Sequence, residues 1–147
     1  MSSETATATA PANPFGGAIP ILRVESLRAA LHYYVESLGF NIVWEHKELF
    51  ACVSRQQCRI FLSQGDQGNT GGWVWIGVAD ASTLEAEYRA SGAKIRHRPT
   101  NYPWAFEMQV EDPDGNVLRF GSDPKADEPY GDWLDENGRL WPSKPDA

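Results

Sequence analysis

The side chains that most often bind metals or perform nucleophilic catalysis are few in this sequence and widely spaced. His32, His46 and His97 are the three histidines, and none has a second histidine or a cysteine at a metal-binding spacing. Cys52 and Cys58, the two cysteines, are too few for a cysteine-rich zinc site or a disulfide framework. Neither a GxSxG nucleophile motif nor a GxGxxG dinucleotide-binding motif is present. The sequence therefore gives no direct indication of these chemistries.

Aromatic residues are abundant instead, with six tryptophans among 147 residues. Flat rings of a ligand can stack on such side chains, and stacking adds about 0.5–1.5 kcal/mol beyond the burial of area. The chain carries 13 basic and 20 acidic residues, a formal net charge of −7. Nucleic acids and anionic membranes are not expected partners, because both need a basic face. This composition suits a soluble cytoplasmic protein, or one that receives a cationic ligand.

The elements that must position these residues follow one order twice. Alternating apolar runs predict a strand, a helix and three further strands in each half of the chain. The pairs Val24/Val78 and Tyr34/Tyr88 are both separated by 54 residues. We therefore predict an α+β domain over residues 18–122, built from two βαβββ modules at about 18–64 and 73–121 whose strands form a curved mixed sheet. A flexible lead, 1–17, and a C-terminal tail, 123–147, flank this domain.

Alternation along the strands predicts which side chains line the concave face of this sheet. Trp73 and Trp75 share that face, and Phe61 occupies it in the first module. Pairing Met108 with Leu118 would place Glu107 directly opposite Arg119 on the same face. Two alternatives stay open: the tryptophans are core residues, or the Glu107–Arg119 pair only closes its hairpin, which is worth about 0.2–1 kcal/mol.

The turn Asp112-Pro113-Asp114-Gly115-Asn116 carries a family resemblance. In the setting of two βαβββ units, with Tyr34 and the run 38–40 (LGF) closing the first helix, it resembles the glyoxalase/bleomycin-resistance (vicinal oxygen chelate) superfamily. The stretch 102–120, which begins YPW and includes Trp104, is similar to the bleomycin-resistance branch. The resemblance covers about residues 18–121 and implies the two-module fold.

Metal-using members of that superfamily have two histidines and a glutamate at positions that are Ile19, Trp73 and Arg119 here. None of these three side chains can ligate a divalent ion. The resemblance therefore implies a metal-free binding protein without a cofactor or catalytic residues. It also implies a homodimer that holds a planar, cationic antibiotic without chemical change. The ligand-binding residues expected on this basis are Phe61, Trp73, Trp75, Trp104, Glu107 and Arg119.

Two other functions remain open at this point. One is an enzyme of the same superfamily with an atypical site, such as a lyase, isomerase or dioxygenase, and the other is an interaction module with a filled cleft. The tail adds a further question, because Tyr130, Trp133 and Trp141 are unusual in a disordered end. We expect it to dock, either on its own sheet or over a partner subunit's cleft.

Overall fold

The computed structural model describes residues 12–140. The first module contains one mixed sheet with the strand order β2-β5-β4-β3. β2 pairs with β5 in parallel, and the remaining neighbours are antiparallel. A short helix and a π-helical turn follow the first strand. The elements are β2 (Ile21–Val24), α1 (Leu27–His32), η1 (Tyr33–Ser37), β3 (Asn41–His46), β4 (Phe50–Arg55) and β5 (Cys58–Gln64).

The second module repeats this order and pairing, with the strand order β6-β9-β8-β7. β6 pairs with β9 in parallel, as β2 does with β5. Its elements are β6 (Trp73–Gly77), α2 (Ala81–Ser91), β7 (Lys94–Asn101), β8 (Phe106–Glu111) and β9 (Val117–Ser122). The predicted α+β class and the two-module arrangement are therefore confirmed.

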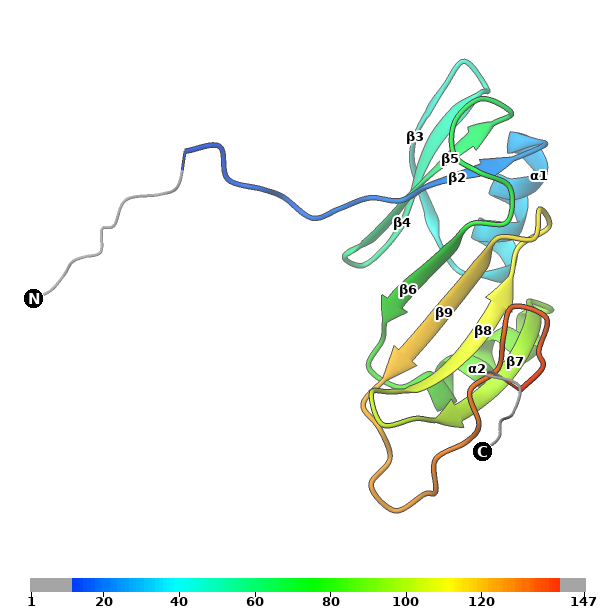
Figure 1. Cartoon of the computed structure of the whole chain (residues 1–147). Helices are drawn as coiled ribbons and strands as arrows, with labels where there is room; N and C mark the ends of the chain where they lie inside the picture. The colour runs from blue at the N-terminus through cyan, green and yellow to red at the C-terminus, as the bar shows by residue number, and fades with distance from the viewer. Residues whose placement is uncertain (1–11, 141–147) are drawn as a thin grey trace, which may run out of the picture.

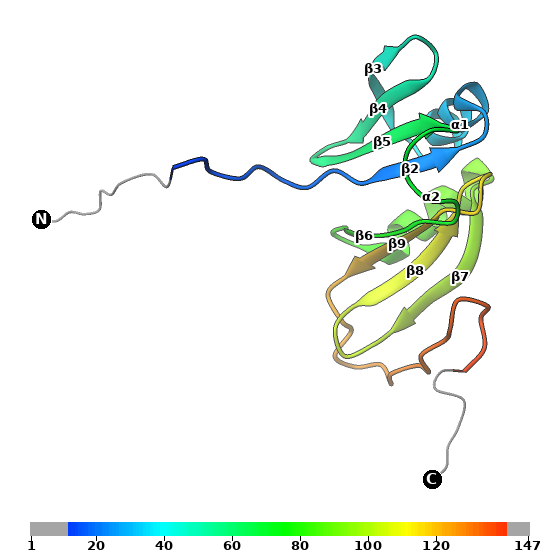
Figure 2. The ribbon, with the colours of Figure 1, turned by 45° about the horizontal axis from the view of Figure 1, so that its top comes forward.

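The two sheets lie next to each other along the molecule, and helices cover one side of each (Figure 1; Figure 2). One continuous core runs through both modules and includes Leu27 and Tyr34 from the first and Tyr88 and Phe120 from the second. The opposite face of each sheet, which we call the open face, is not covered by a helix. Large aromatic side chains remain exposed on this face.

Local sequence explains where both helices begin and where α2 ends. The Ser26 side chain caps α1 by accepting a hydrogen bond from the Ala29 amide, and Asp80 caps α2 by accepting one from the Ser82 amide. Gly92 ends α2 with a positive φ of 81°, a conformation that glycine adopts without strain.

The DPDGN turn joins the second module to the first. Asp112 Oδ1 accepts hydrogen bonds from the amides of Asp114 and Asn116, which fixes a five-residue loop between β8 and β9. The buried Asn116 side chain then donates to the Arg23 carbonyl of β2 at 3.0 Å. The motif is therefore a structural joint in this protein.

The two ends of the described chain differ. Residues 12–18 extend away from the sheets, and Phe15 is exposed (Figure 1). The rest of the predicted flexible lead lies outside the described residues. Residues 123–140 instead run back along the second sheet (Figure 2). Among the helices of residues 12–140, none has the length and apolar character needed to cross a membrane.

Candidate functional site

A single buried carboxylate organises the open face of the second module. Glu107 on β8 is 2% exposed, and both of its carboxylate oxygens accept hydrogen bonds from neighbouring side chains. Oε1 accepts from the indole Nε1 atoms of Trp75 and Trp104, each at 3.0 Å. Oε2 accepts from Arg119 Nε at 2.9 Å and also from Arg119 Nη2. The structure thus brings four of the predicted site residues into one cluster, which we call the Glu107 cluster.

The pairing of β8 with β9 differs from the predicted register. Met108 pairs with Phe120, so Glu107 lies opposite Gly121 and Arg119 lies opposite Gln109. The ion pair between Glu107 and Arg119 is therefore diagonal. The five-residue DPDGN loop moves the register by two residues, which changes each partner but keeps every side chain on its predicted face.

Gly121 is what allows Trp75 to reach the carboxylate. A Cβ atom at Gly121 would lie 2.5 Å from Cζ2 of the Trp75 ring, closer than such atoms approach each other. With no side chain there, the indole lies across β9 and its nitrogen meets Glu107. Trp75 nevertheless remains 50% exposed, so the ring is held at its edge and open to solvent.

Trp104 is held in a similar way and is also accessible. Its ring stacks on Tyr102 with a centroid distance of 5.0 Å and an interplanar angle of 3°. The edge-to-face partner Trp133 comes from the C-terminal segment, with a centroid distance of 5.4 Å. Trp104 is still 53% exposed. Trp75 and Trp104 thus present two fixed aromatic surfaces, since their nitrogen atoms are bound to one carboxylate.

Trp73 lies beside the Glu107 cluster on the same face. Arg96 lies over its ring, with Cζ 5.1 Å from the ring centroid, and donates to Gln109 Oε1. Trp73 and Arg119 both line a cavity of about 510 Å³ on this face. Five of the six predicted site residues therefore belong to one surface of the second module.

Phe61, the sixth, lies on the open face of the other module. It packs with Trp44 and Phe50 in an aromatic cluster with centroid distances of 5.3–5.5 Å. The sequence prediction missed Trp44 because of a bulge between Ile42 and Trp44, which moves Trp44 to the face of Cys52. Alternation alone would assign residues 42 and 44 to one face, so no simple pattern could have found it.

The positions that hold metal ligands in related enzymes do not fit a metal ion here. Trp73 on β6 and Arg119 on β9 offer an indole and a guanidinium, and Ile19 offers no donor atom. Arg119 would bring a positive charge to the site, and Glu107 is already bound to it. Residues 12–140 also contain no group of three or more histidine, cysteine or acidic side chains placed to bind a metal.

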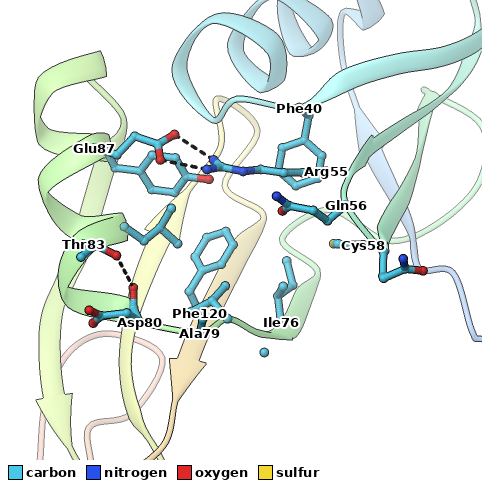
Figure 3. Close-up of a pocket in the computed structure, with 15 residues that line it drawn as sticks. Phe40, Arg55, Gln56, Cys58, Ile76, Ala79, Asp80, Thr83, Glu87 and Phe120 are labelled. Carbon is cyan, nitrogen blue, oxygen red and sulfur yellow. Dashed lines mark hydrogen bonds and ion pairs between the residues drawn. The ribbon is translucent and has the colours of Figure 1, made fainter.

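A second cavity, of about 440 Å³, lies on the helix side between the two modules (Figure 3). Arg55 and Glu87 face each other across its edge in a bidentate pair, with both N–O distances 2.8 Å. Arg55 also donates to the Leu38 carbonyl, and Asp80 caps α2. Burial raises the pKa of the Cys58 thiol in the lining, which disfavours the reactive thiolate. The charged groups of this cavity are thus engaged within the protein, unlike the exposed rings of the open face.

Known structures resemble the whole two-module fold. The bleomycin-binding protein of bleomycin-producing Streptomyces verticillus, in complex with copper(II)-bleomycin, is 25% identical with a TM-score of 0.65, and the match covers 76% of this chain and 98% of that one. TnmS3, an antibiotic-binding protein from Streptomyces sp. CB03234, is 19% identical with a TM-score of 0.61, covering 74% and 97%. Lactoylglutathione lyase from Agrobacterium tumefaciens is 16% identical with a TM-score of 0.62, covering 74% and 95%. The last two likenesses concern the fold alone.

Comparison of sequences gives the family directly. A search of curated proteins finds no significant match to this sequence. Residues 15–120, which include both modules, match the family described as the Glyoxalase/Bleomycin resistance protein/Dioxygenase superfamily. With the βαβββ repeat and the DPDGN joint in place, the chain belongs to the Glyoxalase/Bleomycin resistance protein/Dioxygenase superfamily.

Proposed function

We propose that this protein binds a planar aromatic ligand on the open face of the second module and does not change it chemically. The observation that carries the proposal is the attachment of Trp75 and Trp104 to one buried carboxylate. Rings that are fixed before binding lose little conformational entropy when a ligand stacks on them. Glu107 acts as a positioning residue, because its oxygens are already occupied by protein donors.

The expected ligand is a cationic antibiotic or a molecule of similar chemistry. Support comes from the net charge of −7 and from the 25% identical structure, which binds copper(II)-bleomycin. We further propose a homodimer, because Trp44 and Trp75 leave apolar surface exposed on the open faces of the first and the second module. The unpaired thiols of Cys52 and Cys58 agree with a cytoplasmic location.

Isothermal titration calorimetry of the full chain tests the proposal, with metal-free bleomycin, copper(II)-bleomycin and the planar cation 9-aminoacridine as probes. We expect saturable binding of at least one probe, and recovery of the probe unchanged from the complex. Trp75→Ala and Trp104→Ala should each weaken that binding by about tenfold, as expected for loss of about 1–3 kcal/mol of ring contact.

Leu49→Ala is the matched control, because Leu49 is equally exposed but lies in the turn between β3 and β4. It should bind as the wild type does. The proposal is wrong if none of the probes binds, if the Trp75 and Trp104 variants bind normally, or if the bound probe is recovered chemically altered. Sedimentation equilibrium tests the dimer separately, and a monomer at all concentrations would contradict it.

A further inference from the structure

The C-terminal segment, residues 123–140, forms one side of the cavity on the open face. Trp73, Gln109 and Arg119 come from three strands of the second sheet and line one side of this space. Residues 133–137 line the other side. The volume of about 510 Å³ lies within the range of small-molecule sites. This space is therefore bounded by the sheet and the C-terminal segment together.

One buried side chain attaches this segment to the sheet. Asn101 at the end of β7 is 3% exposed, and its amide group donates to the carbonyls of Lys125 and Glu128 at 2.9 and 3.0 Å. Its Oδ1 atom accepts from the Lys125 amide at 2.8 Å. The Asn101 carbonyl also accepts from the Gly131 amide at 2.7 Å. The segment is thus bound in one register.

The approach of the segment to β7 also depends on glycine. A Cβ atom on Gly131 would overlap the methyl group of Thr100, so a larger residue could not lie there. Just beyond it, the Asp132 carbonyl accepts a hydrogen bond from the Tyr102 hydroxyl at 3.2 Å. These contacts position Trp133 next to the Glu107 cluster. Arg119 Cζ lies 4.9 Å from the centre of the Trp133 ring.

The segment also carries most of the net charge of the protein. Six acidic and two basic side chains lie between residues 123 and 140, a net charge of −4 out of the −7 of the whole chain. Two of the acidic residues, Asp135 and Glu136, line the cavity. The opposite charge in the lining, on Arg119, is paired with Glu107. Amide hydrogen bonds from Arg139 and Asn137, together with the charges of Arg139 and Arg96, lower the pKa of the Asp135 carboxyl. Within residues 12–140 neither Asp135 nor Glu136 forms an ion pair, so the cavity presents two acidic side chains next to aromatic surface.

We propose that residues 123–140 form a fixed wall of the ligand site, and that this wall makes the site select positively charged aromatic ligands over uncharged ones. The inference depends on the proposed function and adds its selectivity. The ligand class is a flat ring system that carries an amine, amidine or guanidine. Its ring extends from the Trp75 and Trp104 surfaces toward Trp133 and Trp73, and its positive group lies near Asp135 and Glu136.

Two acridines of nearly equal shape test the selectivity. At neutral pH 9-aminoacridine is protonated, whereas acridine is uncharged. The double variant Asp135→Asn/Glu136→Gln keeps an oxygen at position 135 to accept the turn hydrogen bonds of Asn137 and Arg139. We expect it to bind 9-aminoacridine about fivefold more weakly at low salt, and acridine as the wild type does.

The matched control is Asp127→Asn/Glu128→Gln, which makes the same charge change in the same segment but outside the cavity lining. It should change both affinities less than about twofold. Equal losses in the two double variants would mean a general charge effect and would overturn the proposed selectivity. The proposed selectivity would also be overturned if the Asp135→Asn/Glu136→Gln protein kept the wild-type preference for 9-aminoacridine over acridine.

Hydrogen exchange tests the fixed wall without any ligand. The amides of Lys125 and Gly131 should exchange slowly in the wild type and fast in Asn101→Ala. Fast exchange of these two amides in the wild type would contradict the proposal that the segment is fixed. If Trp75→Ala weakens binding of both dyes while Trp133→Ala and the acidic variants do not, the proposed function stands and this inference fails. If the wild type binds neither dye, this inference fails, and the proposed function is then decided by the two bleomycin probes alone.

Discussion

The hydroxyl of Tyr34 donates a hydrogen bond to Asp112 Oδ2 at 2.9 Å, and this bond links the helical part of the first module to the β8–β9 turn of the second. Both residues are buried. Tyr88, 54 residues after Tyr34, makes the reciprocal connection by donating to the Leu38 carbonyl at 2.8 Å. Each module thus inserts one tyrosine into the other, and the repeat in the sequence is also a repeat of contacts.

Tyr34→Phe should lower the free energy of unfolding by about 1–3 kcal/mol, because it removes one donor from a buried carboxylate. Urea denaturation at neutral pH measures this. Tyr130→Phe removes an exposed hydroxyl and serves as the control, with an expected change below about 0.5 kcal/mol. Equal stability of the Tyr34→Phe and Tyr130→Phe proteins would show that the Tyr34 bond does not join the modules.

Asp112 should give the stability of the protein an unusual pH dependence. Burial raises the pKa of Asp112 above its ordinary value of 3.8, although hydrogen bonds from Asn116 and Tyr34 oppose the shift. Between pH 3.8 and the raised value, the folded chain holds more protons than the unfolded chain. The contribution of Asp112 to stability is therefore fully present below this window and is lost as the pH rises through it.

Urea denaturation across this pH range measures that contribution as a difference between variants. Asp112→Asn should remove it, so the wild-type stability minus the variant stability should decrease as the pH rises. Asp66→Asn, at an exposed position, should leave the slope unchanged. A difference between wild type and Asp112→Asn that stays constant with pH would contradict the assignment.

Gly121→Ala should displace Trp75 from Glu107, because the added methyl group would occupy the space of the Trp75 ring. Loss of the indole hydrogen bond and overpacking together should cost about 1–3 kcal/mol in the free energy of unfolding. Urea denaturation and the tryptophan emission spectrum measure the two effects. Gly17→Ala adds a methyl group where nothing lies within 4 Å and should change neither. An unaltered emission spectrum in Gly121→Ala would mean that Trp75 does not need this gap.

Glu107→Gln should destabilise the protein by about 3 kcal/mol, because the amide would turn its NH2 group toward either the two indole donors or the Arg119 guanidinium, and the charge that pairs with Arg119 would be lost. Thermal and urea unfolding measure the loss. Glu111→Gln is the matched control on the same strand, since Glu111 pairs with the exposed Lys94 and its loss should cost below about 1 kcal/mol. Similar losses in the two variants would show that Glu107 contributes no more to the free energy of unfolding than an exposed ion pair does.

The sequence was sufficient for the modules because their signals are local. Helical spacing around Tyr34 and Tyr88, and the glycine that ends α2, depend on neighbouring residues only. The face of Trp75 was also correct, since β6 has no bulge. The two-residue register error left Glu107 on its predicted face for the same reason, because the side-chain period of a strand is two.

The remaining parts of the site depend on contacts that no local pattern records. Trp44 changes face at a bulge. Glu107 binds two indoles because Gly121, on another strand, leaves a gap. The position of Trp133 depends on Asn101, which lies 32 residues earlier in the chain. A single unusual feature, a tail rich in aromatic residues, was the available signal for that last contact.

The saturated carboxylate of Glu107 has an evolutionary consequence. Replacement of Trp75, Trp104 or Arg119 alone would leave a buried acid short of a donor, so single changes at these positions are penalised whatever ligand is present. These residues should covary among homologues and change together or not at all. Diversification of ligand preference should then accumulate at Trp73 and in residues 133–137, where a substitution leaves that acid fully bonded.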